Sequence, residues 1–259
     1  MKWVLLLVAC WASGVVGQPA HEHSVLRWIH EAPGGHVHPD QEVRVDPETG
    51  LTGVFATKFI PNGTVLCQVP WEIMIVSHDP DEESSVMCCG MVKTLAKELK
   101  KGNESQYAPY VNYLLSQPDN EIPSGWSKKG QDLLRALVGG IENPLIPPDD
   151  PTEWLTYDWY DRCKGRRSDK LAAKAALLVV KRSDEIVMIP GYDLYNHRNG
   201  KYLNTDVTIM EDEKQVTVAT RDIQPGEQIY NSFNQCAGCE GRRVGYGTAG
   251  TDNTWHNHV

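Results

Sequence analysis

Apolar and polar residues alternate in short stretches near both ends of the chain, and this alternation is typical of half-buried β-strands. Three such stretches come early, at 43–45, 53–57 and 65–69. Three more come late, at 206–210, 215–219 and 228–233. The pattern therefore predicts two groups of strands that a long segment separates.

Between these two groups, apolar residues recur at the spacing of one helix face. One stretch carries Met or Leu at every fourth position, namely Met87, Met91, Leu95 and Leu99. Similar spacing, which is the period of an amphipathic helix, predicts helices at 107–115, 129–138 and 172–180. A proline-dense stretch, 145–151, interrupts them and is predicted to be a rigid connector.

The residues between the strands indicate how the strands pair. A turn at 46–50 and an Asn-Gly pair at 62–63 link the early strands, so we expect a small antiparallel meander. The charged turn 211–214 predicts a hairpin with its hydrophobic face inward. Strands, then helices, then strands predict an α+β fold. In this fold a helical insertion, at about 78–182, splits a β core of small antiparallel sheets.

The first seventeen residues have the features of a secretory signal peptide. Lys2 gives a positive start, an apolar run extends from Trp3 to Trp11, and cleavage is expected after Gly17. The run is shorter than the roughly 20 apolar residues that a membrane-spanning helix needs, and no later segment is long and apolar enough. We therefore expect a protein of the secretory pathway, in the ER lumen or secreted, without a membrane span.

The next segment, 18–41, is rich in His, Pro and Gly. We expect a mobile leader without regular structure, in which Trp28 and Ile29 anchor part of the arm to the surface. Metal binding by its histidines is the less favoured alternative, because no regular element fixes those side chains relative to one another. The folded domain is expected at 42–248, followed by a tail at 249–259.

The charge balance narrows the classes of partner. Lys plus Arg number 25 and Asp plus Glu 34, which gives a net charge of −9 in 259 residues that are 41% hydrophobic. This balance disfavours nucleic acids and anionic membranes, because phosphate binding needs clustered cations. The one dense basic run is Lys164-Gly165-Arg166-Arg167. A solvated helix end is favoured for this run, and an anion site is the alternative.

Six cysteines follow the expected cleavage site, namely Cys67, Cys88, Cys89, Cys163, Cys236 and Cys239. In an oxidising compartment this even number permits three disulfides. Cys236 and Cys239 favour a disulfide, local or to Cys163, because a single cysteine pair is weak support for zinc. No metal site is therefore predicted. Two N-glycosylation triplets, which begin at Asn62 and Asn103, agree with the secretory pathway.

Two polar segments near the late strands have the features of a binding site. Asp193-Leu194-Tyr195-Asn196-His197 comes just past the apolar run 186–189, and the second segment extends from Gly226 to Asn234. Neither segment has metal-ligand spacing or the pattern of a phosphate loop. An Asn-His pair at a strand end, followed by a Pro-Gly-Glu turn and an aromatic strand, indicates a cofactor pocket built from non-adjacent segments.

The chain resembles the SET-domain protein methyltransferases in four pieces, which are 53–57, 189–197, 226–233 and Tyr246-Gly247. The helical insertion and the segment 107–115 are similar to the branch typified by the plant RuBisCO large-subunit lysine methyltransferase. The resemblance spans about 42–248. It implies a SET fold, S-adenosylmethionine as cofactor, and a protein substrate that is methylated on lysine, with histidine as an open variant.

The resemblance also implies roles for individual residues. The cofactor-binding residues would be Thr52, Gly53, Val54, Arg182, Asn196, His197 and Phe233, and the catalytic residues Tyr246 and Phe233. Gly53 suits this role because a missing side chain lets the main chain approach a ligand. Asn196 suits it because an amide offers both a donor and an acceptor. The chemistry needs no metal, since the cofactor's methyl group is already activated on sulfonium.

Several positions depart from the family pattern. Phe233 stands where the family usually has a Tyr whose hydroxyl points at the transferring methyl, and Tyr230 faces the other side of the strand. Leu51 replaces the first glycine of the family's Gly-x-Gly, and Thr248 replaces an aromatic residue that packs on adenine. The branch's C-terminal substrate-binding domain has no counterpart in this sequence.

Three hypotheses follow for the function. The first is an S-adenosylmethionine-dependent protein methyltransferase, with lysine as the favoured acceptor, that works in the secretory pathway. The second is a SET-fold binding module, or pseudoenzyme, whose turnover is weak or lost because of Phe233. The third is a secreted structural protein in which Asn196 and His197 only satisfy buried backbone groups. The sequence leaves the substrate protein and the oligomeric state open.

Overall fold

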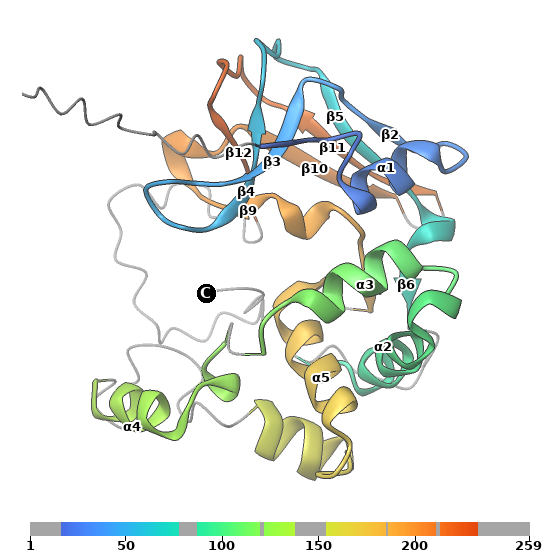
Figure 1. The fold of residues 1–259 in the computed structure, drawn as a ribbon, viewed down its shortest axis with the longest axis vertical. Helices are drawn as coiled ribbons and strands as arrows, with labels where there is room; N and C mark the ends of the chain where they lie inside the picture. Colours follow the sequence, from blue (N-terminus) through green and yellow to red (C-terminus); the bar gives the residue numbers. More distant parts are fainter. Residues whose placement is uncertain are drawn as a thin grey trace, which may run out of the picture.

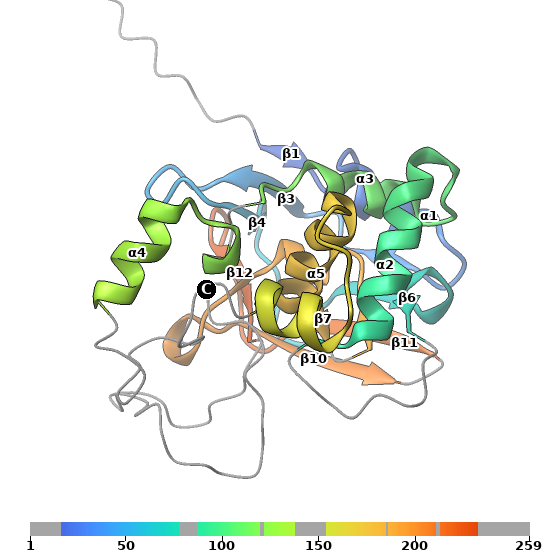
Figure 2. The same cartoon turned by 90° about the horizontal axis from the view of Figure 1, so that it is seen from below.

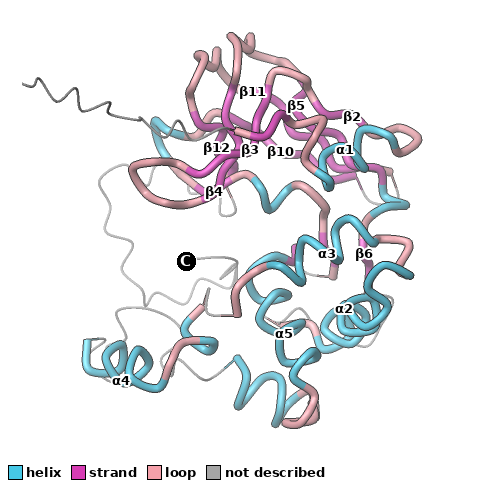
Figure 3. The backbone as a smooth tube through the Cα atoms, viewed as in Figure 1, coloured by secondary structure: helices cyan, strands magenta, loops and turns pink. Residues whose placement is uncertain are grey.

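A computed structural model describes residues 17–77, 87–119, 122–137, 154–184, 186–210 and 213–232. Strands gather at one end of the molecule and most helices at the other (Figures 1 and 3). The signal segment, the connector 145–151, and the residues Phe233, Cys236, Cys239 and Tyr246 lie outside the described residues. The described part is therefore a β core joined to a helical insertion, as an α+β fold requires.

Within the described residues the strands form three sheets. The first has the order β1 (Gln18–Pro19), β3 (Gln41–Val45), β4 (Thr52–Ala56), β12 (Gln228–Asn231) and β9 (Asn196–His197). The second has the order β10 (Thr205–Met210), β11 (Lys214–Ala219), β5 (Val65–Pro70) and β2 (His36–Val37). The third joins β6 (Ile75–Val76), β8 (Val187–Met188) and β7 (Ser183–Asp184).

The helices confirm the four that apolar spacing predicted. They are α2 (Cys89–Lys101), α3 (Ala108–Ser116), α4 (Lys128–Leu137) and α5 (Lys170–Arg182). Side chains cap two of them, since Cys88 Sγ accepts a hydrogen bond from Met91 N and Asp169 Oδ1 accepts one from Ala172 N. α2 packs against α5 (Figure 2). A π-helix, Trp154–Arg162, was not predicted.

The expected mobile leader was wrong. Residues 18–41 contain β1, the helix α1 (Ser24–Glu31) and β2, and they are part of the β core. Val25, Leu26 and Ile29 are fully buried and lie on one face of α1, which contacts α3. The apolar face of this short helix outweighs the surrounding His, Pro and Gly residues because its burial removes apolar surface from water.

The expected meander of the first three strands was also wrong. β3 and β4 pair antiparallel as predicted, but β5 pairs with β11 and β2 in the second sheet. The Asn62-Gly63 turn lies between the two sheets, and Asn62 N donates to Asp222 Oδ1 at 3.0 Å. The turn therefore directs the chain away from β4, toward a partner strand near the other end of the sequence.

The late hairpin forms, but its inward face is not the hydrophobic one. The buried residues of β11 are Gln215, Thr217 and Ala219, whereas Val216 and Val218 are only half-buried. Gln215 Nε2 donates to Thr217 Oγ1 at 2.6 Å, so this polar pair is hydrogen-bonded inside the sheet. This hydrogen bond lowers the free-energy cost of burying the two polar side chains in this register.

One disulfide joins described cysteines, and it corrects an expected pairing. Cys163 bonds to Cys89, with a Cα–Cα distance of 5.4 Å, and not to the Cys236–Cys239 segment. The bond links the start of α2 to the end of the π-helix, two segments that the packing of the insertion brings together. Cys67 and Cys88 are buried thiols. No helix among the residues described above is long and apolar enough to cross a bilayer.

Candidate functional site

Asn196 and the start of β4 lie in direct contact, although they are far apart in the sequence. β12 joins them, because it pairs antiparallel with β4 and parallel with β9. Asn196 Nδ2 donates to the carbonyl oxygen of Thr52 at 3.0 Å. A Cβ at Gly53 would lie 2.3 Å from Gln228 Nε2 and 2.9 Å from Asn196 Nδ2, so this position has no room for a side chain.

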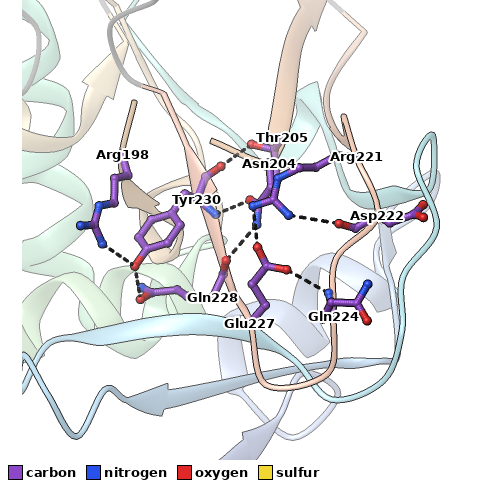
Figure 4. Close-up of polar contacts among 9 residues, drawn as sticks. All are labelled: Arg198, Asn204, Thr205, Arg221, Asp222, Gln224, Glu227, Gln228 and Tyr230. Carbon is purple, nitrogen blue, oxygen red and sulfur yellow. Dashed lines mark hydrogen bonds and ion pairs between the residues drawn. The ribbon is translucent and has the colours of Figure 1, made fainter. Parts of the chain in front are cut away.

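A polar chain on β12 holds the Gln228 amide beside Gly53. Gln228 and Tyr230 share one face of the strand because they are two residues apart. Tyr230 OH donates to Gln228 Oε1 at 2.7 Å, and Arg198 Nη1 lies 3.5 Å from the same hydroxyl (Figure 4). The Arg198 guanidinium also stacks on the ring of Tyr202, at 3.8 Å from its centroid.

Asn204 and Thr205 fix the backbone of β12 from the other side (Figure 4). The fully buried Asn204 accepts from Tyr230 N at 2.8 Å and donates to Gln228 O at 2.9 Å. Thr205 Oγ1 lies 2.7 Å from Tyr230 O and 2.6 Å from Asn231 Oδ1. Sequence reasoning missed both residues, because nothing in the local pattern of a strand start indicates which distant strand its side chains contact.

The carboxylate of Glu227 and the backbone conformation of Gly226 stabilise the turn before β12. Gly226 has a φ of +81°, which glycine adopts readily. Glu227 accepts from Gln224 N at 2.9 Å and from Arg221 Nη2 at 2.5 Å. Partial burial raises the pKa of Glu227, but these hydrogen bonds outweigh it and hold the pKa below its usual value. The carboxylate thus stabilises the turn that leads into the strand.

A buried ion pair lies three residues before Asn196. Arg182, the last residue of α5, donates from Nη1 to Asp193 Oδ2 at 2.9 Å, and each side chain is only 6% exposed. Tyr110 OH donates to the same oxygen at 3.4 Å, and Arg182 also reaches Gln117 Oε1 at 3.1 Å. Burial raises the pKa of Asp193, and the charge of Arg182 opposes this rise.

The structure brings together some of the residues that were predicted to bind a cofactor. Thr52, Gly53 and Asn196 meet, as described above, and His197 pairs with Asn231 across β9 and β12. Val54 is fully buried in the core and contributes its backbone to β4. Arg182 lies in the ion pair with Asp193. Phe233 and Tyr246, the predicted catalytic residues, fall outside the described part of the chain.

The polar groups around Asn196 fit a zwitterionic ligand such as S-adenosylmethionine. Asn196 Oδ1 accepts no hydrogen bond from a described residue. A cofactor that carries an ammonium group needs such an acceptor. Among the residues that the structure describes, no three His, Cys, Asp or Glu side chains form a metal-binding group.

Comparisons with known proteins give one family. The family model for the SET domain matches residues 52–234. A structure of Rubisco LSMT bound to AdoMet is similar, with 16% identity, a TM-score of 0.58, and coverage of 82% of this chain and 52% of that one. The SET domain of LSMT bound to lysine and AdoHcy follows, with 15% identity, a TM-score of 0.51, and coverage of 82% and 53%.

At these identities the likeness shows the fold, and the chain spans about half the length of those structures. No curated protein matches the chain. The family model covers well over half of the sequence and includes every segment that meets at Asn196. The chain therefore belongs to the SET domain family.

Proposed function

We propose that this chain is an S-adenosylmethionine-dependent protein methyltransferase, with lysine as the acceptor, that acts in the secretory pathway. The observation that carries the proposal is the contact of Asn196 with Thr52 and Gly53 across the sheet. Membership of the SET domain family supports it. So do the similar LSMT structures, which hold AdoMet in one case and lysine with AdoHcy in another.

The described residues have positioning roles in this proposal. When bound, the cofactor supplies a methyl group that is already activated on sulfonium. The amides of Asn196 and Gln228 orient the polar end of the ligand beside Gly53, and the buried pair of Arg182 and Asp193 anchors the segment that carries Asn196. Because these groups are held before the ligand arrives, little binding free energy is lost in ordering them.

The acceptor must present a neutral amine. A bound cofactor would supply its methyl group to the lone pair of this neutral nitrogen, and the methylated nitrogen would then lose a proton to water. A channel of low dielectric lowers the pKa of a lysine amine, which favours its neutral form. Phe233 and Tyr246 are the residues that we propose next to the acceptor.

A catalytically weak or inactive binding module is the second candidate. Phe233 lacks the hydroxyl that the family usually has at this position. Tyr230 is the tyrosine on the described part of this strand. Its hydroxyl already donates to Gln228 and accepts from Arg198. Loss of one such oxygen could cost on the order of 10²-fold in rate, so cofactor binding without turnover fits these residues.

Two observations support the secretory pathway as the compartment. The Cys89–Cys163 disulfide is of the kind that persists in oxidising compartments. The two asparagines of the glycosylation triplets, Asn62 and Asn103, are both exposed, as glycosylation requires. Together with the N-terminal signal segment they make the ER lumen or the cell exterior the proposed location.

Calorimetric titration with S-adenosylmethionine tests the pocket, with protein made through the secretory pathway. We expect Asn196→Ala to weaken binding at least tenfold, because it removes an oriented amide at the ligand. Asn112→Ala changes an exposed asparagine on α3 and is the matched control. Absence of binding by the unchanged protein would refute both candidate functions.

A radiolabelled-methyl assay on a secretory-pathway extract then separates the two candidates. Transfer to protein lysine supports the enzyme, whereas binding without transfer supports the binding module. Phe233→Tyr should raise the rate if the missing hydroxyl limits turnover. Acid hydrolysis of the labelled protein identifies the acceptor, and methylhistidine in place of methyllysine would correct the acceptor alone.

A further inference from the structure

A cation-lined groove lies in the helical insertion, between α2 and the loop that joins the π-helix to α5. It encloses about 640 Å³, and its positive lining residues are Lys93, Lys97, Lys100, Lys101, Lys164 and Arg166. Two carboxylates, Glu104 and Asp169, also line it. The groove is therefore locally positive on a chain whose net charge is −9.

Four of the six cations have no carboxylate within ion-pair distance among the described residues. Lys100 pairs with Asp169 at 2.8 Å, and Lys101 pairs with Glu98 at 2.6 Å. The remaining four are Lys93, Lys97, Lys164 and Arg166. Like charges gathered without partners repel one another, so an anionic ligand would stabilise this arrangement.

The floor of the groove holds an unsatisfied donor. Trp159 is 4% exposed and lines the groove, and its buried Nε1 has no hydrogen-bond partner among the residues described. Gly165 packs directly on this indole, because a Cβ there would lie 2.2 Å from the ring. Gly165 also covers the indole nitrogen, so Trp159 gives the groove a packed floor and the cations supply its polar contacts.

Lys164 adopts a backbone conformation that usually belongs to glycine. Its φ is 57°, and in the described part of the chain it is the one non-glycine residue with a positive φ. It follows the end of the π-helix, where the N–H of Gly165 bonds to Trp159 O at 2.8 Å, a place that glycine commonly occupies. A lysine here costs backbone strain but adds a positive charge to the groove.

The spacing of the charges suits an extended peptide. Lys93, Lys97 and Lys101 are one helical turn apart, so their attachment points lie about 6 Å from one another along α2. Carboxylates on alternate residues of an extended peptide lie about 6.6 Å apart. A peptide also offers backbone N–H groups to Glu104 and Asp169, whereas a nucleic acid or sulfated glycan would present charge on every unit and be repelled by them.

We propose that this groove binds an extended acidic segment of a partner protein, with acidic residues at alternate positions. The cations on α2, together with Lys164 and Arg166, hold the carboxylates of the peptide. The disulfide between Cys89 and Cys163 fixes Lys164 against α2 and so holds the groove open to its ligand. This inference concerns binding alone and does not depend on methyl transfer.

Fluorescence anisotropy of a labelled twelve-residue Ser-Glu repeat peptide tests the proposal, with the full chain and low salt. We expect saturable binding that weakens as salt rises, because exposed charges are screened. The variant Lys93→Gln/Lys97→Gln should bind roughly tenfold more weakly. The control Lys128→Gln/Lys129→Gln makes the same charge change on α4 and should leave the affinity unchanged.

Lys164→Gly separates binding from folding. Glycine relieves the strain of a positive φ, so the melting temperature should stay the same or rise while peptide affinity falls. No binding by the unchanged protein, or equal affinity in the Lys93→Gln/Lys97→Gln variant, would overturn the proposal. Tighter binding of a single-stranded oligonucleotide or a sulfated oligosaccharide than of the peptide would overturn the assignment to a peptide.

Discussion

The region around Asn196 and the cationic groove use polar groups in different ways. Around Asn196 the groups are mostly neutral amides and hydroxyls, and hydrogen bonds between 2.6 and 3.0 Å join them to sheet backbone and to one another. In the groove they are cations, four of them lysines on α2 and two on the loop before α5, and most of them lack a carboxylate partner among the described residues. The first arrangement selects a ligand by shape and the second by charge.

The largest expected effect comes from the buried ion pair behind Asn196. Asp193→Asn should destabilise the fold by about 3–5 kcal/mol, because it leaves the Arg182 guanidinium buried without its carboxylate. Chemical denaturation measures this loss. Asp119→Asn removes an exposed partner of Lys174 and should change little. Equal losses in the two variants would show that burial does not distinguish these pairs.

Loss of the Cys89–Cys163 disulfide should have the second-largest effect on the free energy of unfolding, and it should lower the affinity of the groove for the acidic peptide. Cys89→Ser should cost about 2–4 kcal/mol, because the crosslink closes a long loop of the unfolded chain. Cys88→Ser keeps an oxygen that can cap α2 and should cost less. Denaturation with and without reductant measures both changes. If Cys89→Ser lowered S-adenosylmethionine affinity as much as acidic-peptide affinity, the two regions would not be independent.

Substitutions of Asn204 test how far the stability of the region around Asn196 depends on hydrogen bonds. Asn204→Ala removes the amide from Tyr230 N and Gln228 O, and it should cost about 2 kcal/mol by leaving buried backbone groups unpaired. Asn204→Asp keeps the acceptor for Tyr230 N, but it places a carboxylate at a fully buried position that also contacts Glu227. It should therefore cost at least as much as Asn204→Ala, and denaturation together with cofactor titration should give that order.

The smallest expected effect concerns a carboxylate of the insertion. Partial burial raises the pKa of Glu98, but hydrogen bonds from Lys101 and Ser105 outweigh it and hold the pKa below 4.5. The folded protein therefore binds this proton less tightly than the unfolded chain does. The stabilisation is fully present above pH 4.5 and is lost as the pH falls through the folded pKa.

Glu98→Gln should cost about 1 kcal/mol at neutral pH. It should also flatten the stability profile below pH 4.5. Urea denaturation across that range measures both effects. An unchanged acid profile in Glu98→Gln would assign the acid sensitivity of the protein to other carboxylates.

Local periodicity was enough to predict most elements and not enough to predict their partners. The four-residue spacing of Met87, Met91, Leu95 and Leu99 located α2, and alternation located β10 and β11. The spacing of Val25, Leu26 and Ile29 was available as a sign of α1, but the surrounding His, Pro and Gly residues obscured it. Partner choice depends on packing across the whole chain, which no local window contains.

The site shows the same division. Asn196 and Gly53 could be named from the sequence because their residue types follow a family pattern. Gln228 and Tyr230 lay in the segment 226–234 that was predicted to be part of the site, but their hydrogen bond to each other could not be predicted. Asn204 was missed, because its role comes from where β12 meets the loop before β10. The prediction of a hydrophobic buried face on β11 was wrong for a related reason. Gln215 and Thr217 are buried where the alternating pattern placed the valines.

The central place of β12 has a consequence for folding kinetics. Asn196 and Thr52 are 144 residues apart, and Arg44 and Gly226 are 182 apart, yet β12 is hydrogen-bonded to both the early strand β4 and the late strand β9. Contacts between residues so far apart in the sequence form slowly. The chain must first lose the entropy of closing a large loop, and only then do the contacts stabilise it. The helices of the insertion can form while the cofactor site is still absent. An emerging chain would therefore have a folded insertion well before it had a binding site.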